Sequence, residues 1–213
     1  MNIHSFVFNP FYENTYVIHV DGLAWIIDPG CYEKHEQKQL DDFILSANLK
    51  PVAVINTHCH IDHVLGNAYV KDKYGIPLWI PAGELDMLRA VTAYGPNWGI
   101  TGYQEAEPDR LLEENDQLEL NGVRFEIRLA PGHSPGHLVY YQEASQVLIA
   151  GDVLFRESIG RTDLPGGDPA MLEKSIREKI YNLPGQVTVY PGHGPTTTIS
   201  HEKMYNPFIN ERS

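Results

Sequence analysis

The stretch that decides the fold is Thr57-His58-Cys59-His60-Ile61-Asp62-His63. It directly follows a short apolar run over residues 52–56, which is typical of a buried strand. A helix is expected from about residue 63 to residue 74, because Gly75 and Pro77 end it. The stretch therefore joins a buried strand to a helix and is rich in side chains that bind metal ions.

Four of the six residues in this stretch from 58 to 63 are of metal-ligand type, namely His58, His60, Asp62 and His63. Imidazole nitrogens and carboxylate oxygens bind zinc, iron or manganese. His58 and His60 can point the same way if the chain is extended there, and Asp62 and His63 can face a second point once a helix begins. The stretch can thus serve two neighbouring ions. The alternative, a polar loop with structural histidines, is disfavoured by so dense a cluster.

Three further ligand-type residues follow predicted strands. His133 lies in Pro131-Gly132-His133-Ser134-Pro135-Gly136-His137 after residues 123–129, Asp152 follows residues 147–150, and His193 follows residues 187–190. Adjacent glycines let the backbone approach an ion closely, and loops at strand ends are where sites gather. With the first cluster they supply seven ligands, enough for two ions that share one carboxylate.

The remaining pattern indicates a layered α/β fold. Asp21-Gly22 and Asn121-Gly122 predict hairpins between strands 15–20 and 24–28 and between strands 118–120 and 123–129. Another strand pair is expected over 138–142 and 147–150. Helical spacing joins Leu40, Phe43, Ile44 and Ala47, and later Leu172, Ile176, Ile180 and Leu183. A helix near residues 85–89 and a loop over 94–99 are expected in the otherwise unclear segment 81–116. Strands in runs, with helices between and after them, favour mostly antiparallel sheets.

Composition limits the function classes. The chain has 213 residues, 42% of them hydrophobic and 21% charged, which suits one globular domain over residues 1–213. A net charge of −12 argues against nucleic acid as a partner. Neither a membrane-spanning stretch nor a signal-peptide pattern is present. Cys31 and Cys59 do not suggest a disulfide framework, so a cytoplasmic location is expected. The oligomeric state stays open.

The ligand-type residues carry a resemblance to a known family. His58-Cys59-His60-Ile61-Asp62-His63, then His133, Gly151-Asp152 and Pro191-Gly192-His193, resemble the metallo-β-lactamase superfamily in order and spacing, over nearly the whole chain. Within it, the sequence looks like a short bacterial branch of the glyoxalase II group, the hydroxyacylglutathione hydrolases. The fold that this resemblance implies is an αββα sandwich of two mixed β-sheets flanked by helices. Only 20 residues follow His193, too few for the C-terminal helical domain that glyoxalase II usually carries.

The resemblance also implies a ligand set and a reaction. One ion is expected on His58, His60 and His133, the other on Asp62, His63 and His193, with Asp152 as the bridge. Zinc is the expected metal, with iron or manganese as alternatives. Such ions lower the pKa of bound water from about 15.7 to near 7. The hydroxide would attack a thioester such as S-D-lactoylglutathione, with Asp62 and Asp152 as catalytic residues.

Arg161 is the candidate substrate-binding residue. It lies nine residues after Asp152 in Ser158-Ile159-Gly160-Arg161-Thr162-Asp163. A guanidinium group can bind a carboxylate with two hydrogen bonds, and the corresponding stretch of glyoxalase II carries a basic residue that contacts the thiol's carboxylate. The alternative is an ion pair between Arg161 and Asp163.

Several roles are left open by the sequence. Asp28 is either an acceptor for a ligand histidine or a turn residue. His137 is expected to support its loop, and Cys59 to pack in the interior. Tyr94 and Trp98 could line a substrate pocket or simply pack.

Competing functions are a persulfide dioxygenase with one iron, a lactone or β-lactam hydrolase, a nuclease, and a metal-binding module without catalysis. The full seven-ligand set disfavours the first and the last. A bridging Asp152, where many β-lactamases carry cysteine nearby, favours thioester hydrolysis. The absence of a basic face argues against a nuclease.

Overall fold

The computed structural model describes residues 1–209 and divides the chain into two compact units. The first comprises Met1–Leu112 with the short piece Glu119–Val123, and the second comprises Glu113–Leu118 and the chain from Arg124 onward. Within residues 1–209, no helix is both long and apolar enough to cross a membrane. The prediction of a single domain stays a prediction.

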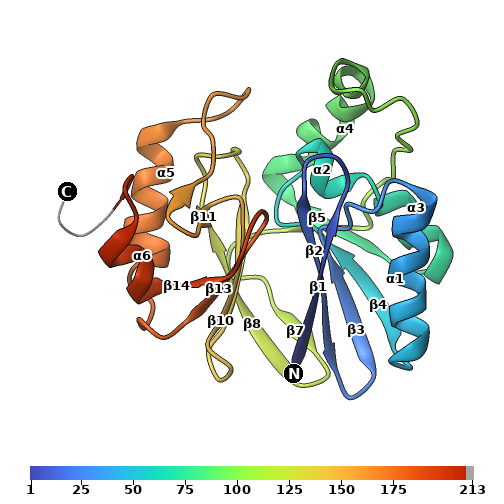
Figure 1. Ribbon diagram of the computed structural model, residues 1–213, viewed down its shortest axis with the longest axis horizontal. Coiled ribbons are helices and arrows are strands. Elements are labelled where there is room, and N and C mark those ends of the chain that lie inside the picture. Colours follow the sequence, from blue (N-terminus) through green and yellow to red (C-terminus); the bar gives the residue numbers. More distant parts are fainter. Residues whose placement is uncertain (210–213) are drawn as a thin grey trace. The chain divides into compact units, whose positions relative to one another are not determined.

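The first unit is built on a six-stranded mixed sheet in the order β1-β2-β3-β4-β5-β6 (Figure 1). Its strands are β1 (Asn2–Phe8), β2 (Glu13–Val20), β3 (Leu23–Ile27), β4 (Lys50–Ile55), β5 (Leu78–Pro81) and β6 (Arg110–Leu112). Its helices are α1 (Lys34–Ser46), α2 (Ile61–Val64), α3 (Asn67–Tyr74) and α4 (Leu85–Tyr94), with 3₁₀ turns η1 (Ala82–Glu84) and η2 (Gly95–Trp98).

Local sequence explains these elements. The predicted hairpin between β2 and β3 turns at Asp21 and Gly22, which have φ values of 47° and 85°, the left-handed pair that a tight hairpin needs. Helix α1 begins at a capping box between Glu33 and Glu36. Leu40 and Ile44 of α1 are buried in the core that the helices form against one face of the sheet. Gly75, with φ 62°, ends α3 as predicted.

Parallel pairing positions the metal-ligand loop. β3 pairs with β4, β4 with β5 and β5 with β6, all parallel, so three of the five pairings in this sheet are parallel. The expectation of mostly antiparallel sheets is therefore wrong for the first unit, because helical crossovers separate these strands in the sequence. The carboxyl ends of β3 and β4 lie side by side, and Asp28 and the stretch from Thr57 to His63 leave the sheet there.

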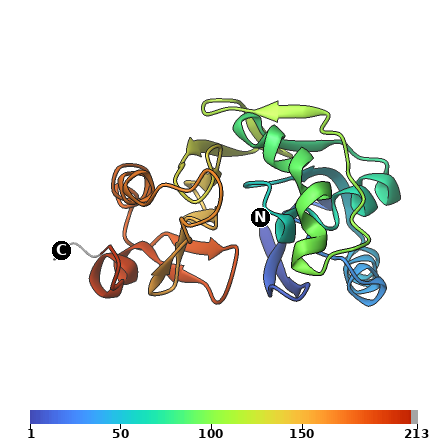
Figure 2. The ribbon, with the colours of Figure 1, turned by 90° about the horizontal axis from the view of Figure 1, so that it is seen from above.

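The other six-stranded mixed sheet has the order β14-β13-β10-β9-β8-β7 and belongs to the second unit except for residues Glu119–Val123. Its strands are β7 (Leu118–Leu120), β8 (Val123–Leu129), β9 (Leu138–Gln142), β10 (Val147–Gly151), β13 (Thr188–Pro191) and β14 (Thr197–Thr198), and a small hairpin is formed by β11 (Leu154–Phe155) and β12 (Ser158–Ile159). Figures 1 and 2 show α5 (Pro169–Ser175, orange) and α6 (Ile199–Tyr205, red) on one side of this sheet. β8 pairs with β9, β9 with β10 and β13 with β14 in antiparallel orientation, whereas β10 and β13 are parallel.

The core of the second unit follows the predicted patterns. Every residue of β9 and β10 is buried, as expected for central strands. Leu172, Ile176 and Ile180 pack into the same apolar cluster, and the helix that they predict is α5 continued by the π-helical segment Ile176–Ile180. Together the two units confirm the predicted fold class: two mixed β-sheets flanked by helices.

Candidate metal centre

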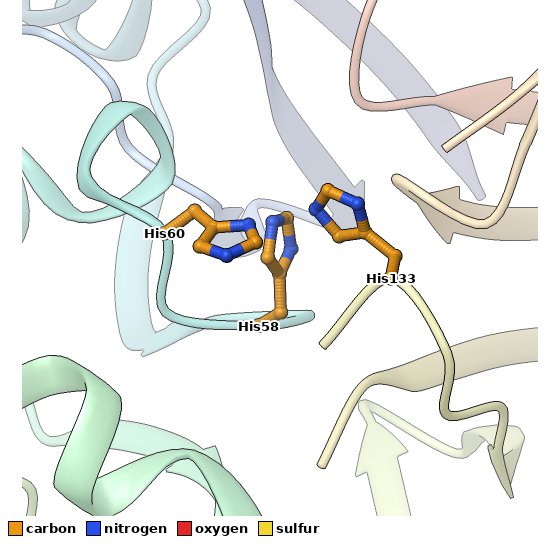
Figure 3. A group of neighbouring side chains, drawn as sticks. All are labelled: His58, His60 and His133. Atoms are coloured by element: carbon orange, nitrogen blue, oxygen red, sulfur yellow. The ribbon is translucent and has the colours of Figure 1, made fainter. Parts of the chain in front are cut away.

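The loop after β4 is arranged as its sequence predicts. His60 is extended, with φ −65° and ψ 152°, and α2 begins at the next residue, so the change from extended chain to helix falls within the cluster. The ring centroid of His58 lies 4.9 Å from that of His60 and 4.2 Å from that of His63. His58 and His63 are fully buried. Figure 3 shows the side chains of His58 and His60 of this loop and of His133 in the second unit.

Asp28 orients two of these histidines. Its Oδ1 accepts a hydrogen bond from the Thr57 backbone N–H at 2.7 Å, and its Oδ2 accepts one from the Thr57 hydroxyl at 2.6 Å. Because the hydroxyl proton is used there, the hydroxyl oxygen can accept from Nδ1 of His58, 3.0 Å away. Oδ2 of Asp28 also lies 3.2 Å from Nδ1 of His63. Asp28 thus lies beside a histidine of the cluster, as its first alternative expects, and its role toward a metal ligand stays a prediction.

Two polar residues outside the loop hold its backbone. The Cys59 N–H donates to the fully buried Glu84 carboxylate at 3.0 Å, and the Asn9 side chain donates to the Asp62 carbonyl at 2.9 Å. Cys59 itself packs in the core as predicted, and burial raises the pKa of its thiol. We did not predict Glu84 or Asn9 from the sequence, because a single acidic residue or asparagine in a turn gives no local signal of a distant partner.

In the second unit, one carboxylate lies between two histidines. Oδ2 of Asp152 is 3.5 Å from Nε2 of His133 and 3.5 Å from Nε2 of His193. The parallel pairing of β10 with β13 produces this arrangement, since Gly151 is in register with Pro191 and the Gly192 N–H donates to the Gly151 carbonyl. His133 enters from the loop after β8. The structure thus brings together the three predicted ligands of the second unit.

The segment after β12 supports this trio. Nδ1 of His133 is 2.8 Å from the Arg161 carbonyl oxygen, which can accept a hydrogen bond from the Nδ1–H, and Nε2 lies toward Asp152. Gly160 is required for the close approach, because a Cβ there would lie 1.9 Å from the Asp152 carbonyl oxygen. His137 accepts a hydrogen bond from the Asp152 N–H at 3.0 Å. His137 therefore supports the loop, as predicted.

The Arg161 side chain forms the ion pair that the sequence offered as the alternative. Its Nε and Nη2 donate to the two carboxylate oxygens of Asp163 at 2.7 and 2.8 Å. These hydrogen bonds lower the pKa of Asp163 to about 2. Both side chains are exposed, so the pair is open to competition by another carboxylate.

Comparisons with known proteins show which family the chain belongs to. The model of the metallo-beta-lactamase superfamily matches residues 8–198. The chain belongs to the metallo-β-lactamase superfamily. It is 36% identical to hydroxyacylglutathione hydrolase GloC of Haemophilus influenzae over an alignment of 217 positions, which covers 100% of both chains.

Two solved structures are similar to this member of the superfamily. BLEG-1 B3 metallo-beta-lactamase has a TM-score of 0.89 and 37% identity, with 98% of this chain and 99% of that chain covered. TTHA1623 in a di-iron-bound form has a TM-score of 0.86 and 35% identity, with 97% and 100% covered. The chain is accordingly a metal-dependent hydrolase of this superfamily, with histidine-rich loops that fit divalent metal ions.

Proposed function

We propose that the protein hydrolyses a thioester of a low-mass thiol, such as S-D-lactoylglutathione, at a centre of two divalent metal ions. The observation that carries this proposal is the position of Asp152. Its Oδ2 atom lies 3.5 Å from Nε2 of His133 and 3.5 Å from Nε2 of His193. A carboxylate between two histidines suits a bridge between two ions. The similarity to a hydroxyacylglutathione hydrolase over the whole chain supports the thioester class.

The ligands would divide as the family pattern implies. His58, His60 and His133 would hold one ion, Asp62, His63 and His193 the other, and Asp152 both. The donor chemistry fits metal ions, because His58, His63 and His133 each have Nδ1 within 3.2 Å of an oxygen. A ligand histidine commonly donates its second ring N–H in this way, which fixes the tautomer and directs Nε2 to the ion.

Ions held there would act as Lewis acids on the thioester carbonyl and would supply a water of lowered pKa. The residues of the chain have distinct tasks in such a reaction. The Asp62 carboxylate, whose Oδ2 lies 3.7 Å from Nε2 of His63, would accept a hydrogen bond from the attacking water and orient it. Arg161 would bind a carboxylate of the thiol by exchanging Asp163 for it. The identity of the metal is proposed as zinc, with iron as the alternative that a di-iron relative supports.

A β-lactam ring is the second candidate substrate, because of the similarity to a B3 metallo-beta-lactamase. Both reactions attack an acyl carbon, and they differ in the leaving group, a thiolate or an amine. Persulfide oxidation is a third reaction to be tested. That reaction would require one iron ion and no bridging carboxylate.

The test is a direct comparison of substrates on protein of known metal content. S-D-lactoylglutathione, a penicillin and glutathione persulfide would be assayed on the same zinc-loaded and iron-loaded samples. The proposal expects the highest kcat/KM for the thioester in at least one metal form, and loss of that activity in Asp152→Ala. Higher activity on the penicillin would establish the second candidate. Oxygen-dependent turnover of the persulfide alone would replace hydrolysis as the function.

A further inference from the structure

The turn between β1 and β2 carries an aromatic residue that the fold itself does not favour. Tyr12 is 73% exposed, and its φ of 60° lies in the left-handed region, where a bulky side chain strains the backbone. The exposed Tyr12 ring is not part of the apolar core. Strained residues cluster at active sites and at positions that hold a ligand, which makes this turn a candidate for such a role.

A second aromatic side chain lies against this turn. Trp98, at the end of η2, is 46% exposed, and its ring centroid lies 6.1 Å from that of the partly buried Phe11 with an interplanar angle of 64°. This edge-to-face contact joins the β1–β2 turn to the η2 segment. We call Phe11, Tyr12 and Trp98 the aromatic edge.

Both segments of the aromatic edge are fixed to the helix that bears Asp62. Asn9 begins the turn, and its side chain donates to the carbonyl oxygens of Asp62 and Gly30 at 2.9 and 3.1 Å. Gly95 begins η2 and packs on α2 so closely that a Cβ there would lie 3.2 Å from Cδ1 of Ile61. In Figure 1 the β1–β2 turn and α2 lie at the same end of the first sheet. The aromatic edge is therefore anchored to a residue of the proposed metal centre.

Neither segment of the aromatic edge contains a charged residue. Residues 9–12 are Asn-Pro-Phe-Tyr and residues 95–100 are Gly-Pro-Asn-Trp-Gly-Ile, in a chain where 21% of residues are charged. An uncharged, exposed aromatic surface suits an apolar group, whereas an anionic group would be drawn to a cation such as Arg161.

We infer that the aromatic edge binds the apolar part of the substrate's acyl group and makes the enzyme prefer aryl over small acyl groups. This inference rests on the proposed thioester hydrolysis. An aryl ring packed against Trp98 and Tyr12 would lie beside the residue that positions the attacking water. The acyl carbon would thereby be held near the metal centre while the thiol's carboxylate is bound elsewhere.

The test uses two thioesters of one thiol. S-D-mandeloylglutathione carries a phenyl group where S-D-lactoylglutathione carries a methyl group. Wild-type protein is expected to favour the mandeloyl ester in kcat/KM. Tyr12→Asn and Trp98→Ala should each lower kcat/KM for that ester by roughly threefold to tenfold, as expected for the loss of one aromatic contact. The lactoyl ester should change by less than about twofold on the same grounds.

Stability separates a binding role from a structural one. Asparagine tolerates positive φ, so Tyr12→Asn should leave the melting temperature unchanged or raise it. Leu45→Ala is the matched control, because Leu45 is an apolar side chain of α1 that is 81% exposed and belongs to neither aromatic segment. It should alter neither ester. Equal losses on both esters, or a lower melting temperature with unchanged selectivity, would overturn the inference.

A binding measurement tests the aromatic edge even if the proposed hydrolysis of thioesters is wrong. If metal-loaded wild-type protein cleaves neither ester, thioester hydrolysis is wrong, and the aromatic edge is then tested by NMR titration with mandelate and lactate. Tighter binding of mandelate in wild type, with that preference lost in Trp98→Ala, supports the inference. Equal binding of the two acids refutes it. So does a dimer in sedimentation that Trp98→Ala dissociates, since a second copy would then cover the edge.

Discussion

Gly160→Ala should damage the metal centre although Gly160 is not a ligand. A Cβ at this position would lie 1.9 Å from the Asp152 carbonyl oxygen and 3.1 Å from Nδ1 of His133. Cβ atoms in proteins essentially never lie within 3.0 Å of a non-bonded heavy atom. The obstructing oxygen belongs to the backbone, so no side chain can rotate away, and one of the two segments must move by at least about 1.1 Å.

That displacement is large compared with the hydrogen bond that it affects. Nδ1 of His133 and the Arg161 carbonyl are 2.8 Å apart, so a shift of this size along the bond would take them beyond hydrogen-bond distance. If Asp152 moved instead, its position relative to His133 and His193 would be lost. Removing the partner of a ligand histidine typically lowers metal affinity or activity by about tenfold to a hundredfold. We expect a loss in this range.

The assay is competition for zinc against a chromophoric chelator, followed by kcat/KM for the thioester at saturating metal. Gly185→Ala is the control, because the nearest atom to its Cβ would be the Ser200 Cβ at 3.2 Å and φ is not positive there. The control should keep wild-type affinity. Wild-type affinity and activity in Gly160→Ala would refute the reasoning, since they would show that the His133–Arg161 contact does not matter.

Four further predictions concern the site. Asp152→Ala should lose both ions and His193→Ala only one, measured as metal per chain; two retained ions in Asp152→Ala would exclude the bridge. Arg161→Ala should raise KM for an anionic thioester by roughly tenfold to a hundredfold, and KM for a neutral thioester much less. Asp163→Asn should lower KM for the anionic thioester, because it removes the carboxylate that competes for Arg161. The pKa of Asp163 is about 2, so it stays charged at neutral pH and the gain from Asp163→Asn should be the same at pH 6 and pH 8; a gain that changes with pH would point to another group. Asp28→Asn should weaken zinc binding about tenfold to a hundredfold, because the Thr57 hydroxyl and His63 would lose the Oδ2 acceptor. Unchanged affinity would make Asp28 a turn residue.

Local sequence signals predicted much of the fold. The hairpins at Asp21-Gly22 and Asn121-Gly122 form as expected, because both residues of each turn have the positive φ that such dipeptides accept. The first ligand cluster was readable for the same reason, since His58 to His63 follow a buried strand without a gap. Asp152 and His193 were identified separately at strand ends, and parallel pairing of their strands brings them together.

What the sequence did not reveal depends on contacts between distant segments. β5 and β6 are short, and they become strands through parallel pairing with a strand far away in the sequence. β1 was missed because it lies at the edge of its sheet and only two of its residues are buried. The expected loop over residues 94–99 contains the 3₁₀ turn η2, whose packing on Ile61 depends on α2. Glu84 and Asn9 support the ligand loop across 25 and 53 residues of sequence, which no local pattern records.

The most direct test of the account is the number of metal ions per chain. Protein purified without chelator and supplemented with zinc, then freed of unbound metal, would be measured by elemental analysis against its concentration. Seven ligands with Asp152 between two histidines predict close to two transition-metal ions per chain. At most one ion at full occupancy would contradict the two-metal centre and favour a single-iron enzyme.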